Sequence, residues 1–236
     1  MVNINTIEKT TIWSFPDRGN WLNHKGDYPG NWSPHVPKNI ILRYSKEGEV
    51  VLDQFVGSGT TLIEAERLNR VCIGSDINEN ALNICKQRIK ESNNIFIKKQ
   101  DARYLNLLKD SSIDLICTHP PYADIVKYSK DIEGDISLLE LDKFYSEMKL
   151  VAKNCYRVLK GKKFCAILMG DKRKNGIIEP IGFKTMNIFL QEGFKLKEIV
   201  IKEQHNCKMT DKWMKISEER NFLLIAHEYL FIMMKS

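Results

Sequence analysis

Residues 50–77 read VVLDQFVGSGTTLIEAERLNRVCIGSDI, and this stretch decides the fold. A continuous apolar run is followed by a glycine turn, an amphipathic helical stretch and a second apolar run that ends at Asp76. The order strand, helix, strand predicts two parallel neighbours joined by a crossover helix. The pattern continues downstream, so the sequence predicts an α/β fold with a doubly wound, mostly parallel sheet.

The rest of the chain extends this alternation to its end. Helical patterns lie at 78–92, after a capping Asn78, at 137–160, closed by Gly161, and at 181–193, and further strands are expected at 94–102, 112–118, 163–171, 194–203 and 222–234. No helix-length segment is apparent between the last two strands, which suggest an antiparallel hairpin at the sheet edge.

Composition sets broad limits on the kind of protein. The chain has 236 residues, 43% of them apolar and 28% charged, which fits one domain with a full core. Six cysteines without metal-ligand spacing indicate reduced core thiols, and no signal peptide or membrane span is expected, so we expect a cytoplasmic protein without a metal. A net charge of +6 is compatible with a polyanionic partner.

Residues 1–48 differ from the rest. They are rich in Trp, Pro, Gly and Asn up to a short helical stretch at 38–45. Because Trp13, Trp21 and Trp32 would be costly to leave in water, we expect an ordered arm that contributes to a binding site.

The glycine turn and Asp76 indicate a nucleotide-like ligand. Gly57 and Gly59 stand at a strand-to-helix turn, where a missing Cβ lets the backbone approach a ligand. An acid that ends the following strand, as Asp76 does, accepts hydrogen bonds from ribose hydroxyls in such folds. The turn has neither the phosphate-loop Gly-Lys-Ser/Thr nor the full GxGxxG pattern of NAD enzymes.

The stretch THPPY, residues 118–122, ends the strand at 112–118. Consecutive prolines remove two N–H donors and leave their carbonyls free to accept. Tyr122, directly after the prolines, has an aromatic ring that can stack on a planar ligand. Taken alone, the stretch favours a Pro-Pro turn that ends a strand, with Tyr122 as packing.

Together these motifs resemble the DNA amino-methyltransferases. The family's D-P-F-x-G-S-G-T-T is similar to DQFVGSGTT, residues 53–61, with Gln54 in place of proline, and its [DNS]-P-P-[YFW] is similar to HPPY, residues 119–122. A preceding H-P-A-x-F-P element is approximated by residues 33–49, and the order of motifs is that of the gamma class. The resemblance implies a seven-stranded Rossmann-like fold and methyl transfer from S-adenosylmethionine (SAM) to an exocyclic amine of a flipped DNA base.

The resemblance also implies roles for particular residues. The residues expected to hold SAM are Asp53, Phe55, Gly57, Ser58, Gly59, Thr60, Asp76, Asp101 and Pro37, and those expected at the amine are His119, Pro120, Pro121 and Tyr122. Asp101 is as readily a cap of the next short helix. His119 departs from the family's Asp, Asn or Ser, and only a neutral imidazole can accept from the amine. Thr118 before it favours cytosine N4 as the target.

Several alternatives stay open. They are an adenine-N6 enzyme, an RNA or protein amine methyltransferase, and a non-catalytic nucleic-acid-binding subunit that keeps the fold. We expect double-stranded DNA as partner, with contacts from Lys172, Arg173 and Lys174 and from Lys208, Lys212 and Trp213 in a recognition segment at 202–220. The resemblance leaves open a cognate restriction endonuclease, and either a monomer or a homodimer. His227 and Glu228 are expected to be structural strand residues.

The predicted organisation is therefore one methyltransferase domain over residues 1–236. It consists of the arm at 1–48, which adds an element to the SAM pocket, and the catalytic α/β core at 49–236.

Overall fold

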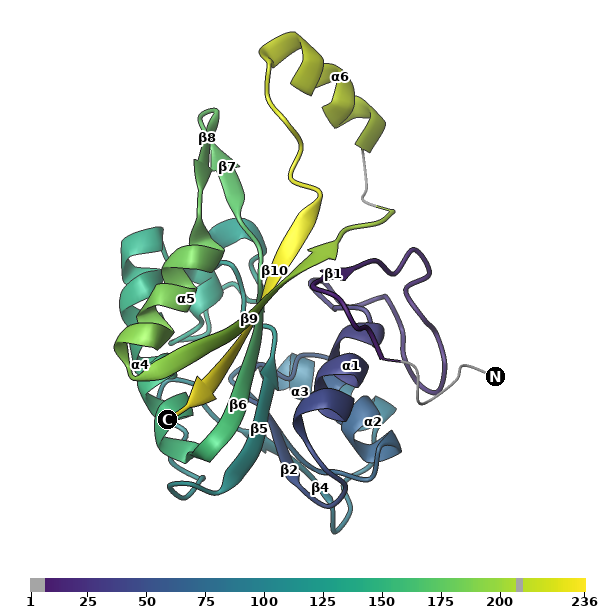
Figure 1. Ribbon diagram of the computed structural model, residues 1–236, viewed down its shortest axis with the longest axis vertical. Helices are drawn as coiled ribbons and strands as arrows, with labels where there is room; N and C mark the ends of the chain where they lie inside the picture. Colours follow the sequence, from purple (N-terminus) through teal and green to yellow (C-terminus); the bar gives the residue numbers. More distant parts are fainter. Residues whose placement is uncertain (1–6, 207–209) are drawn as a thin grey trace.

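A computed structural model describes residues 7–206 and 210–236. Their elements in chain order are β1 Ile12–Trp13, α1 His35–Tyr44, β2 Val50–Asp53, α2 Thr60–Arg67, β3 Val71–Asp76, α3 Glu79–Arg88, β4 Ile95–Lys99, β5 Ile113–Thr118, the 3-10 turns η1 Ala123–Ile125 and η2 Ile136–Leu138, α4 Leu141–Val158, β6 Leu159–Met169, β7 Lys172–Lys174, β8 Ile177–Glu179, α5 Ile181–Gln191, β9 Phe194–Glu203, α6 Thr210–Arg220 and β10 His227–Lys235 (Figure 1).

The main sheet has eight strands in the order β1-β9-β10-β6-β5-β2-β3-β4. The pairs β2–β3, β2–β5, β3–β4 and β5–β6 are parallel, whereas β10 is antiparallel to both β6 and β9. Seven of these strands form the predicted α/β sheet with its antiparallel hairpin, and the two-residue β1 adds an eighth at the edge. The predicted fold class is confirmed.

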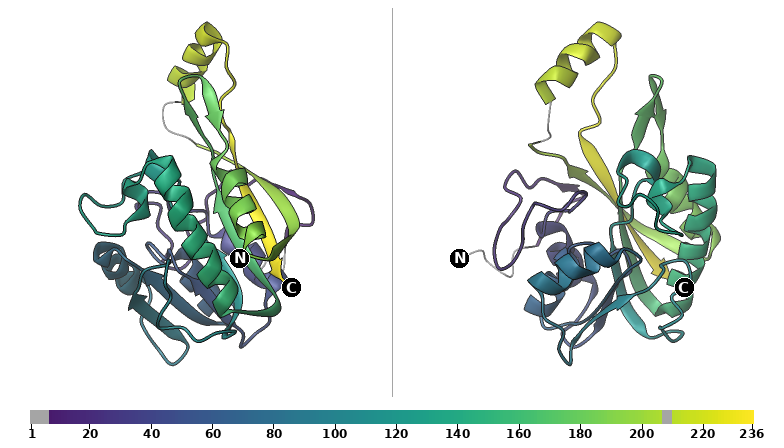
Figure 2. Two further views of the ribbon diagram at one scale, coloured as in Figure 1. Left: turned by 90° about the vertical axis from the view of Figure 1, so that its left-hand side faces the viewer. Right: turned by 180° about the vertical axis from the view of Figure 1, so that it is seen from behind.

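Helices cover both faces of the sheet. Helices α1, α2 and α3 pack on one face and α4 and α5 on the other, as the views in Figures 1 and 2 show. Neighbouring strand residues alternate between the two cores: Val51 and Leu115 belong to the first, and Leu52 and Ile116 to the second. This period of two explains why the central strands are continuous apolar runs, since both of their faces are buried.

Several predicted boundaries are wrong: the helix predicted at 78–92 ends at Arg88, and the helix predicted at 137–160 begins only at Leu141. Helix α6 lies between β9 and β10, where no helix is expected, and none of its residues is buried, so it carries no apolar periodicity to detect. Strand β10 begins at His227 and not at residue 222, because residues 222–226 leave the sheet and Leu223 is 85% exposed. Helix α4 ends at Val158 and not at residue 160, because β6 already pairs with β5 at Leu159.

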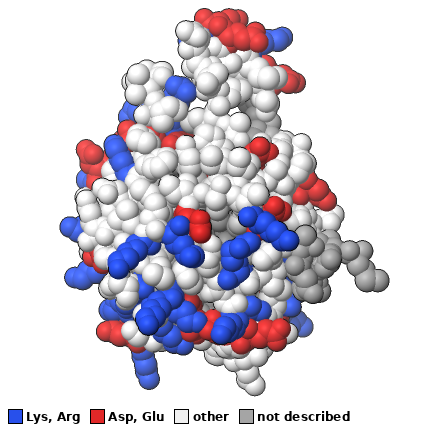
Figure 3. Space-filling model, in the orientation of Figure 1, with Lys and Arg blue, Asp and Glu red and all other residues white. Residues whose placement is uncertain are grey.

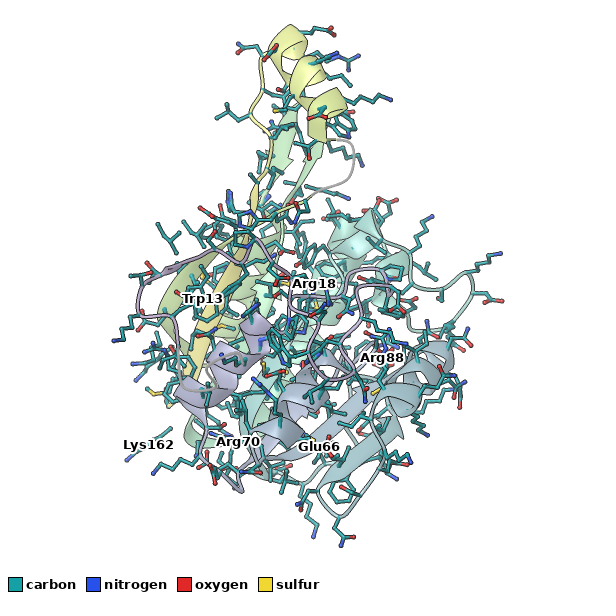
Figure 4. The ribbon with its side chains drawn as sticks, turned by 90° about the vertical axis from the view of Figure 1, so that its right-hand side faces the viewer. Trp13, Arg18, Glu66, Arg70, Arg88 and Lys162 are labelled. Atoms are coloured by element: carbon teal, nitrogen blue, oxygen red, sulfur yellow. The ribbon has the colours of Figure 1, made fainter. Side chains whose placement is uncertain are left out.

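The described part of the arm, residues 7–34, is ordered, as predicted. Trp13 and Trp32 are buried, and Trp21 donates from Nε1 to Glu64 of α2 over 2.7 Å. Helix α1 begins at His35, three residues before the predicted start. Figure 4 shows Trp13 of the arm close to the strands and Arg88 of α3 on the opposite side of the view. Arg88 forms an ion pair with Asp27 of the arm. These contacts fasten the arm to the helices beside it.

The five cysteines within the described residues are buried and unpaired, in agreement with the predicted reduced core thiols. Cys207 lies outside the described residues. Among the described helices, none combines the length and apolar character that crossing a membrane requires.

Candidate active site

A cavity of about 810 Å³ opens where the parallel strands end. Asp53, Asp76 and Thr118 are the last residues of β2, β3 and β5. Because these strands are parallel, their carboxyl ends meet at one edge of the sheet, which is where α/β sheets bind ligands.

The glycine turn forms one wall of this cavity. Gly57 and Gly59 both have positive φ, 49° and 91°, and a Cβ on Gly59 would lie 2.8 Å from the sulfur of Cys85 in α3. Side chains larger than glycine are therefore excluded here. Ser58 between them lines the cavity and is buried, and its hydroxyl has no hydrogen-bond partner in the protein. Such an unsatisfied group fits a polar ligand.

Asp76 faces the turn from the next strand. Its two carboxylate oxygens accept from the backbone N–H groups of Gly57, over 3.0 Å, and Asn78, over 2.9 Å. Each oxygen retains acceptor capacity for a ligand hydroxyl. Burial raises the pKa of Asp76 to about 6, against the effect of these two hydrogen bonds.

Asp53 joins three elements beneath the cavity. It accepts from the Thr118 hydroxyl over 2.8 Å, from Thr61 of α2 over 2.5 Å and from the Phe55 N–H over 3.1 Å. Burial raises the pKa of Asp53 to about 6, although all three hydrogen bonds act in the opposite direction. These hydrogen bonds tie β2, β5 and α2 together, and Asp53 itself also lines the cavity.

The remaining predicted cofactor residues divide into two groups. Phe55, Thr60 and Asp101 line the cavity, and Asp101 also accepts from the Arg103 backbone N–H over 2.9 Å and forms an ion pair with its side chain at 2.6 Å. The expectation that Asp101 caps a short helix is wrong, because the described residues between β4 and β5 form turns and no helix; Asp101 instead accepts within a turn and lines the cavity. Pro37 is buried in α1 and does not line the cavity.

The arm supplies the opposite wall, which sequence reasoning expected only in general terms. Tyr28 of the arm stacks on Tyr128, with ring centroids 6.1 Å apart, and both line the cavity. Asn31 accepts from the Thr60 hydroxyl over 2.5 Å. Gly30 is required, since its φ is 67° and a Cβ there would fall on the Tyr128 hydroxyl. The clustered Gly and Asn residues of the arm were the sequence signal for this wall.

A second cavity of about 1090 Å³ adjoins the first. His119 lines both cavities, Pro121 lines the first, and Pro120 and Tyr122 line the second. The HPPY motif is therefore the wall that the two cavities share. Trp32 from the arm also lines both and stacks on the His119 ring at 5.4 Å with an interplanar angle of 24°.

A hydrogen-bonded chain runs along the second cavity. The Nε2 of His119 lies 2.5 Å from the Tyr122 hydroxyl, which donates to Oε1 of Glu228 over 2.8 Å. Lys202 of β9 donates to Oε2 of Glu228 over 2.9 Å. Contrary to the expected purely structural role, Glu228 thus lies against the motif. Since β10 is antiparallel, it enters the sheet at the edge where β5 ends.

His119 is held neutral in this chain. Burial lowers the pKa of His119 to about 4, and Lys202 acts in the same direction, whereas Glu228 and a hydrogen bond to the Gly30 backbone oppose it. Burial raises the pKa of Glu228, but Lys202, His119 and the hydrogen bond from Tyr122 outweigh it and hold that pKa below its usual range. At neutral pH the chain therefore contains a neutral imidazole and an ionised carboxylate.

The basic residues that we expect to contact DNA at 172–174 lie in a β-hairpin and not in a loop. Lys172, Arg173 and Lys174 constitute β7, which pairs with β8. Lys172 forms an ion pair with Asp124, and Arg173 donates to the carbonyl of Leu223 over 3.0 Å. Lys174 is exposed. Arg173 thus connects the hairpin to the segment after α6, and Figures 1 and 2 show both projecting from the same end of the sheet.

The predicted recognition segment contains α6. Lys212 and Trp213 lie on this helix, Trp213 is 48% exposed, and Lys208 lies outside the described residues. The three acidic and three basic side chains of α6 cancel. Figure 3 shows acidic side chains at its tip, while Lys and Arg gather at the far end of the same face. Helix α6 is therefore an exposed projection that carries equal numbers of acidic and basic side chains.

Comparison with known proteins gives one family match. The sequence matches the family described as DNA methylase over residues 2–87 and 113–236, which is most of the chain. A type II methyltransferase, M2.DpnII from Streptococcus pneumoniae, is 41% identical over 68 residues, covering 29% of this chain and 25% of the relative. A tRNA (guanine(10)-N2)-dimethyltransferase from Methanocaldococcus jannaschii is 34% identical over 121 residues, covering 48% and 34%.

A solved structure agrees with the fold. The crystal structure of a SAM-dependent methyltransferase from Methanosarcina mazei superimposes with a TM-score of 0.57 at 15% identity, covering 83% of this chain and 96% of that chain. The chain matches only about a quarter to a third of the length of the two curated relatives.

Proposed function

The chain belongs to the DNA methylase family, and on that premise we propose that it transfers the methyl group of SAM to an exocyclic amine of a flipped DNA base, with cytosine N4 as the target. The observation that carries the proposal is the position of HPPY. His119 and the two prolines lie between the cavity at the carboxyl ends of the parallel strands and the second cavity beside it.

The cofactor is SAM, and the first cavity suits it. Asp76 has free acceptor capacity for ribose hydroxyls, the Ser58 hydroxyl lacks a protein partner, and the glycine turn keeps the wall free of side chains. When bound, SAM supplies an electrophilic methyl group on a sulfonium. The contribution of the protein is to position the amine, because a direct displacement needs alignment more than covalent help.

The amine would meet acceptors on the motif. An exocyclic amine conjugates its lone pair into the ring and attacks poorly unless acceptors draw it towards a tetrahedral geometry. His119 is neutral, so one ring nitrogen can accept, and the proline carbonyls add acceptors without competing N–H donors. A neutral acceptor is comparable to the serine of cytosine-N4 enzymes, and this supports cytosine over adenine.

The residue before His119 does not strengthen that choice. The Thr118 hydroxyl donates to Asp53 and so holds β5 and β2 together. Its proton is therefore already used within the protein. Adenine N6 is accordingly the alternative target. Guanine N2 in RNA is a second candidate, favoured by the tRNA methyltransferase relative.

The test is methyl transfer from labelled SAM to duplex DNA and to tRNA in parallel reactions. We expect label in duplex DNA. Label only in tRNA would move the substrate to RNA, and SAM binding without label in any nucleic acid would indicate a non-catalytic subunit.

A further inference from the structure

We propose that Glu64 of α2 is a positioning residue for the cofactor: it holds the arm where the arm closes the first cavity, and so couples docking of the arm to SAM binding. The inference rests on the proposed assignment of the first cavity to SAM and does not depend on which base is methylated. Glu64 is not among the residues that line either cavity, so it acts through the arm.

The arm forms one side of both cavities. Residues 28–32 line the first cavity, and Gly30, Asn31 and Trp32 line the second as well. This segment contains no helix or strand. An irregular segment keeps its position only through contacts with the rest of the protein, so the shape of both cavities depends on what holds the arm.

One carboxylate receives two side chains of the arm. Oε1 of Glu64 accepts from Nε1 of Trp21 over 2.7 Å and lies 2.8 Å from Nε2 of His24. Because a carboxylate only accepts, this His24 nitrogen is the donor. Oε2 pairs with Arg67 of the same helix at 3.0 Å. The Glu64 side chain is fully buried, and a buried carboxylate is costly unless such donors satisfy it.

The turn between Trp21 and His24 is unfavourable on its own. Leu22 within it has a φ of 55°, in the left-handed region that L-residues rarely adopt. Leu22 is also 62% exposed, so its burial does not offset the strain. The residues that flank this turn both donate to Glu64. The buried carboxylate therefore stabilises a backbone shape that the loop would not keep by itself.

A second ion pair holds the same loop less firmly. Arg88 of α3 pairs with Asp27, but the Asp27 side chain is 62% exposed. Exposed ion pairs contribute little to stability, because water competes for both partners. Glu64 is fully buried. It is therefore the anchor whose loss should affect the arm most.

Helix α2 joins the two walls of the first cavity. It begins at Thr60, directly after Gly59 of the glycine turn, and Thr60 itself lines the cavity. Thr60 donates to Asn31 of the arm over 2.5 Å, and Glu64 lies one helical turn further on. A ligand that contacts both walls favours the docked arm, and by linkage the docked arm favours the ligand by the same factor.

Glu64→Met is the first variant, because it removes the acceptor and keeps a side chain of similar length. We expect the Kd for SAM, measured by calorimetry, to rise by about tenfold or more, since apparent affinity falls with the fraction of molecules whose arm is docked. Glu64→Gln keeps one oxygen for the arm and should restore much of the affinity. Glu66→Met, at an exposed position of the same helix (Figure 4), is the matched control and should bind SAM as the wild type does.

Limited trypsin digestion reports on the arm directly. Lys25 is an exposed residue of the loop, and Lys162 lies on β6 at the far end of the molecule. Cleavage after Lys25 should be faster in Glu64→Met than in the wild type, cleavage after Lys162 should be unchanged, and saturating SAM should slow the first alone. If Glu64 only stabilised the fold, its loss would speed cleavage at both sites alike.

Trp21→Phe tests whether the contact itself is responsible. It keeps an aromatic ring and removes the N–H that reaches Glu64. Trp21→Phe should raise the Kd for SAM in the wild-type background and change it much less in the Glu64→Met background, because both variants break the same hydrogen bond. Fully additive effects would overturn the inference.

The remaining outcomes separate the inference from the proposed function. If the wild-type protein binds SAM while Glu64→Met binds it equally tightly and its arm is cut no faster, the coupling is wrong and the SAM site stands. If the wild-type protein binds no SAM, the assignment of the first cavity fails, and the coupling fails with it.

Discussion

Replacement of Gly57 by alanine should weaken SAM binding more than it weakens the fold. Gly57 has a φ of 49°, and an added Cβ would lie 3.2 Å from a ring carbon of Tyr28, which lines the opposite wall of the first cavity. Either Tyr28 or the turn must move by a few tenths of an ångström. The N–H of Gly57 donates to Asp76, so movement of the turn also disturbs the expected ribose acceptor.

The magnitudes follow from these contacts. A left-handed backbone costs an L-residue roughly 1–2 kcal/mol, which should appear as a loss of unfolding free energy. Weakening a hydrogen bond to a charged group costs about 1.5–3 kcal/mol. We therefore expect the Kd for SAM to rise by about ten- to a hundredfold.

Gly48→Ala separates the two effects. Gly48 has a φ of 78° and no heavy atom within 4 Å of an added Cβ, so this variant incurs the backbone cost without touching the cavity. Urea unfolding should show similar destabilisation of both variants, while calorimetric titration should show weaker SAM binding in Gly57→Ala alone. Equal SAM affinity in the two variants would refute the assignment of the turn as a cofactor wall.

Three other perturbations test separate parts of the site. The pKa of Asp76 is raised to about 6, and the ionised carboxylate is the better hydrogen-bond acceptor. SAM affinity measured by calorimetry should therefore fall as the pH drops below about 6. Asp76→Asn should flatten that pH dependence. If Lys174 contacts a phosphate, Lys174→Glu should reduce the slope of log DNA affinity against log salt concentration by about 1. Lys162, on β6 at the far end of the molecule, is the control, and Lys162→Glu should leave this slope unchanged. Equal slopes for the two variants would remove Lys174 from the DNA interface. Tyr122→Ala should lower kcat by at least about tenfold while SAM affinity stays close to wild type, because stacking on a base contributes roughly 1–3 kcal/mol; full turnover in this variant would exclude stacking.

The central sheet could be predicted because its signals are local. Strands β2, β3 and β5 are apolar runs that end in Asp53, Asp76 and Thr118, and the glycine turn marks where helix α2 begins. These signals are short-range patterns of burial and backbone freedom. They place the cofactor edge of the sheet without any knowledge of long-range contacts.

Glu228 could not be assigned in this way. Its contact with Tyr122 joins residues 106 positions apart and depends on the register in which β10 pairs with β6 and β9. In sequence, Glu228 is one acid in an apolar strand. Only the antiparallel entry of β10 at the carboxyl edge brings it to the motif.

Helix α6 could not be predicted from the sequence for a different reason. Most of its residues are compatible with a helix, but none is buried, so hydrophobic periodicity gives no signal. The stacked pair Tyr28 and Tyr128, which lines the first cavity, could not be predicted from the sequence either. Both residues come from irregular segments and meet only through tertiary packing. Sequence patterns thus found the residues whose signal is local and missed those that meet only through tertiary packing.

Mass spectrometry of nucleosides from duplex DNA, after incubation with the protein and SAM, tests the central claim most directly. The account predicts N4-methylcytosine that is absent when SAM or protein is omitted. N6-methyladenine in its place would contradict the choice of base. DNA without any methylated amine, from a protein preparation that binds SAM, would contradict the proposed reaction itself.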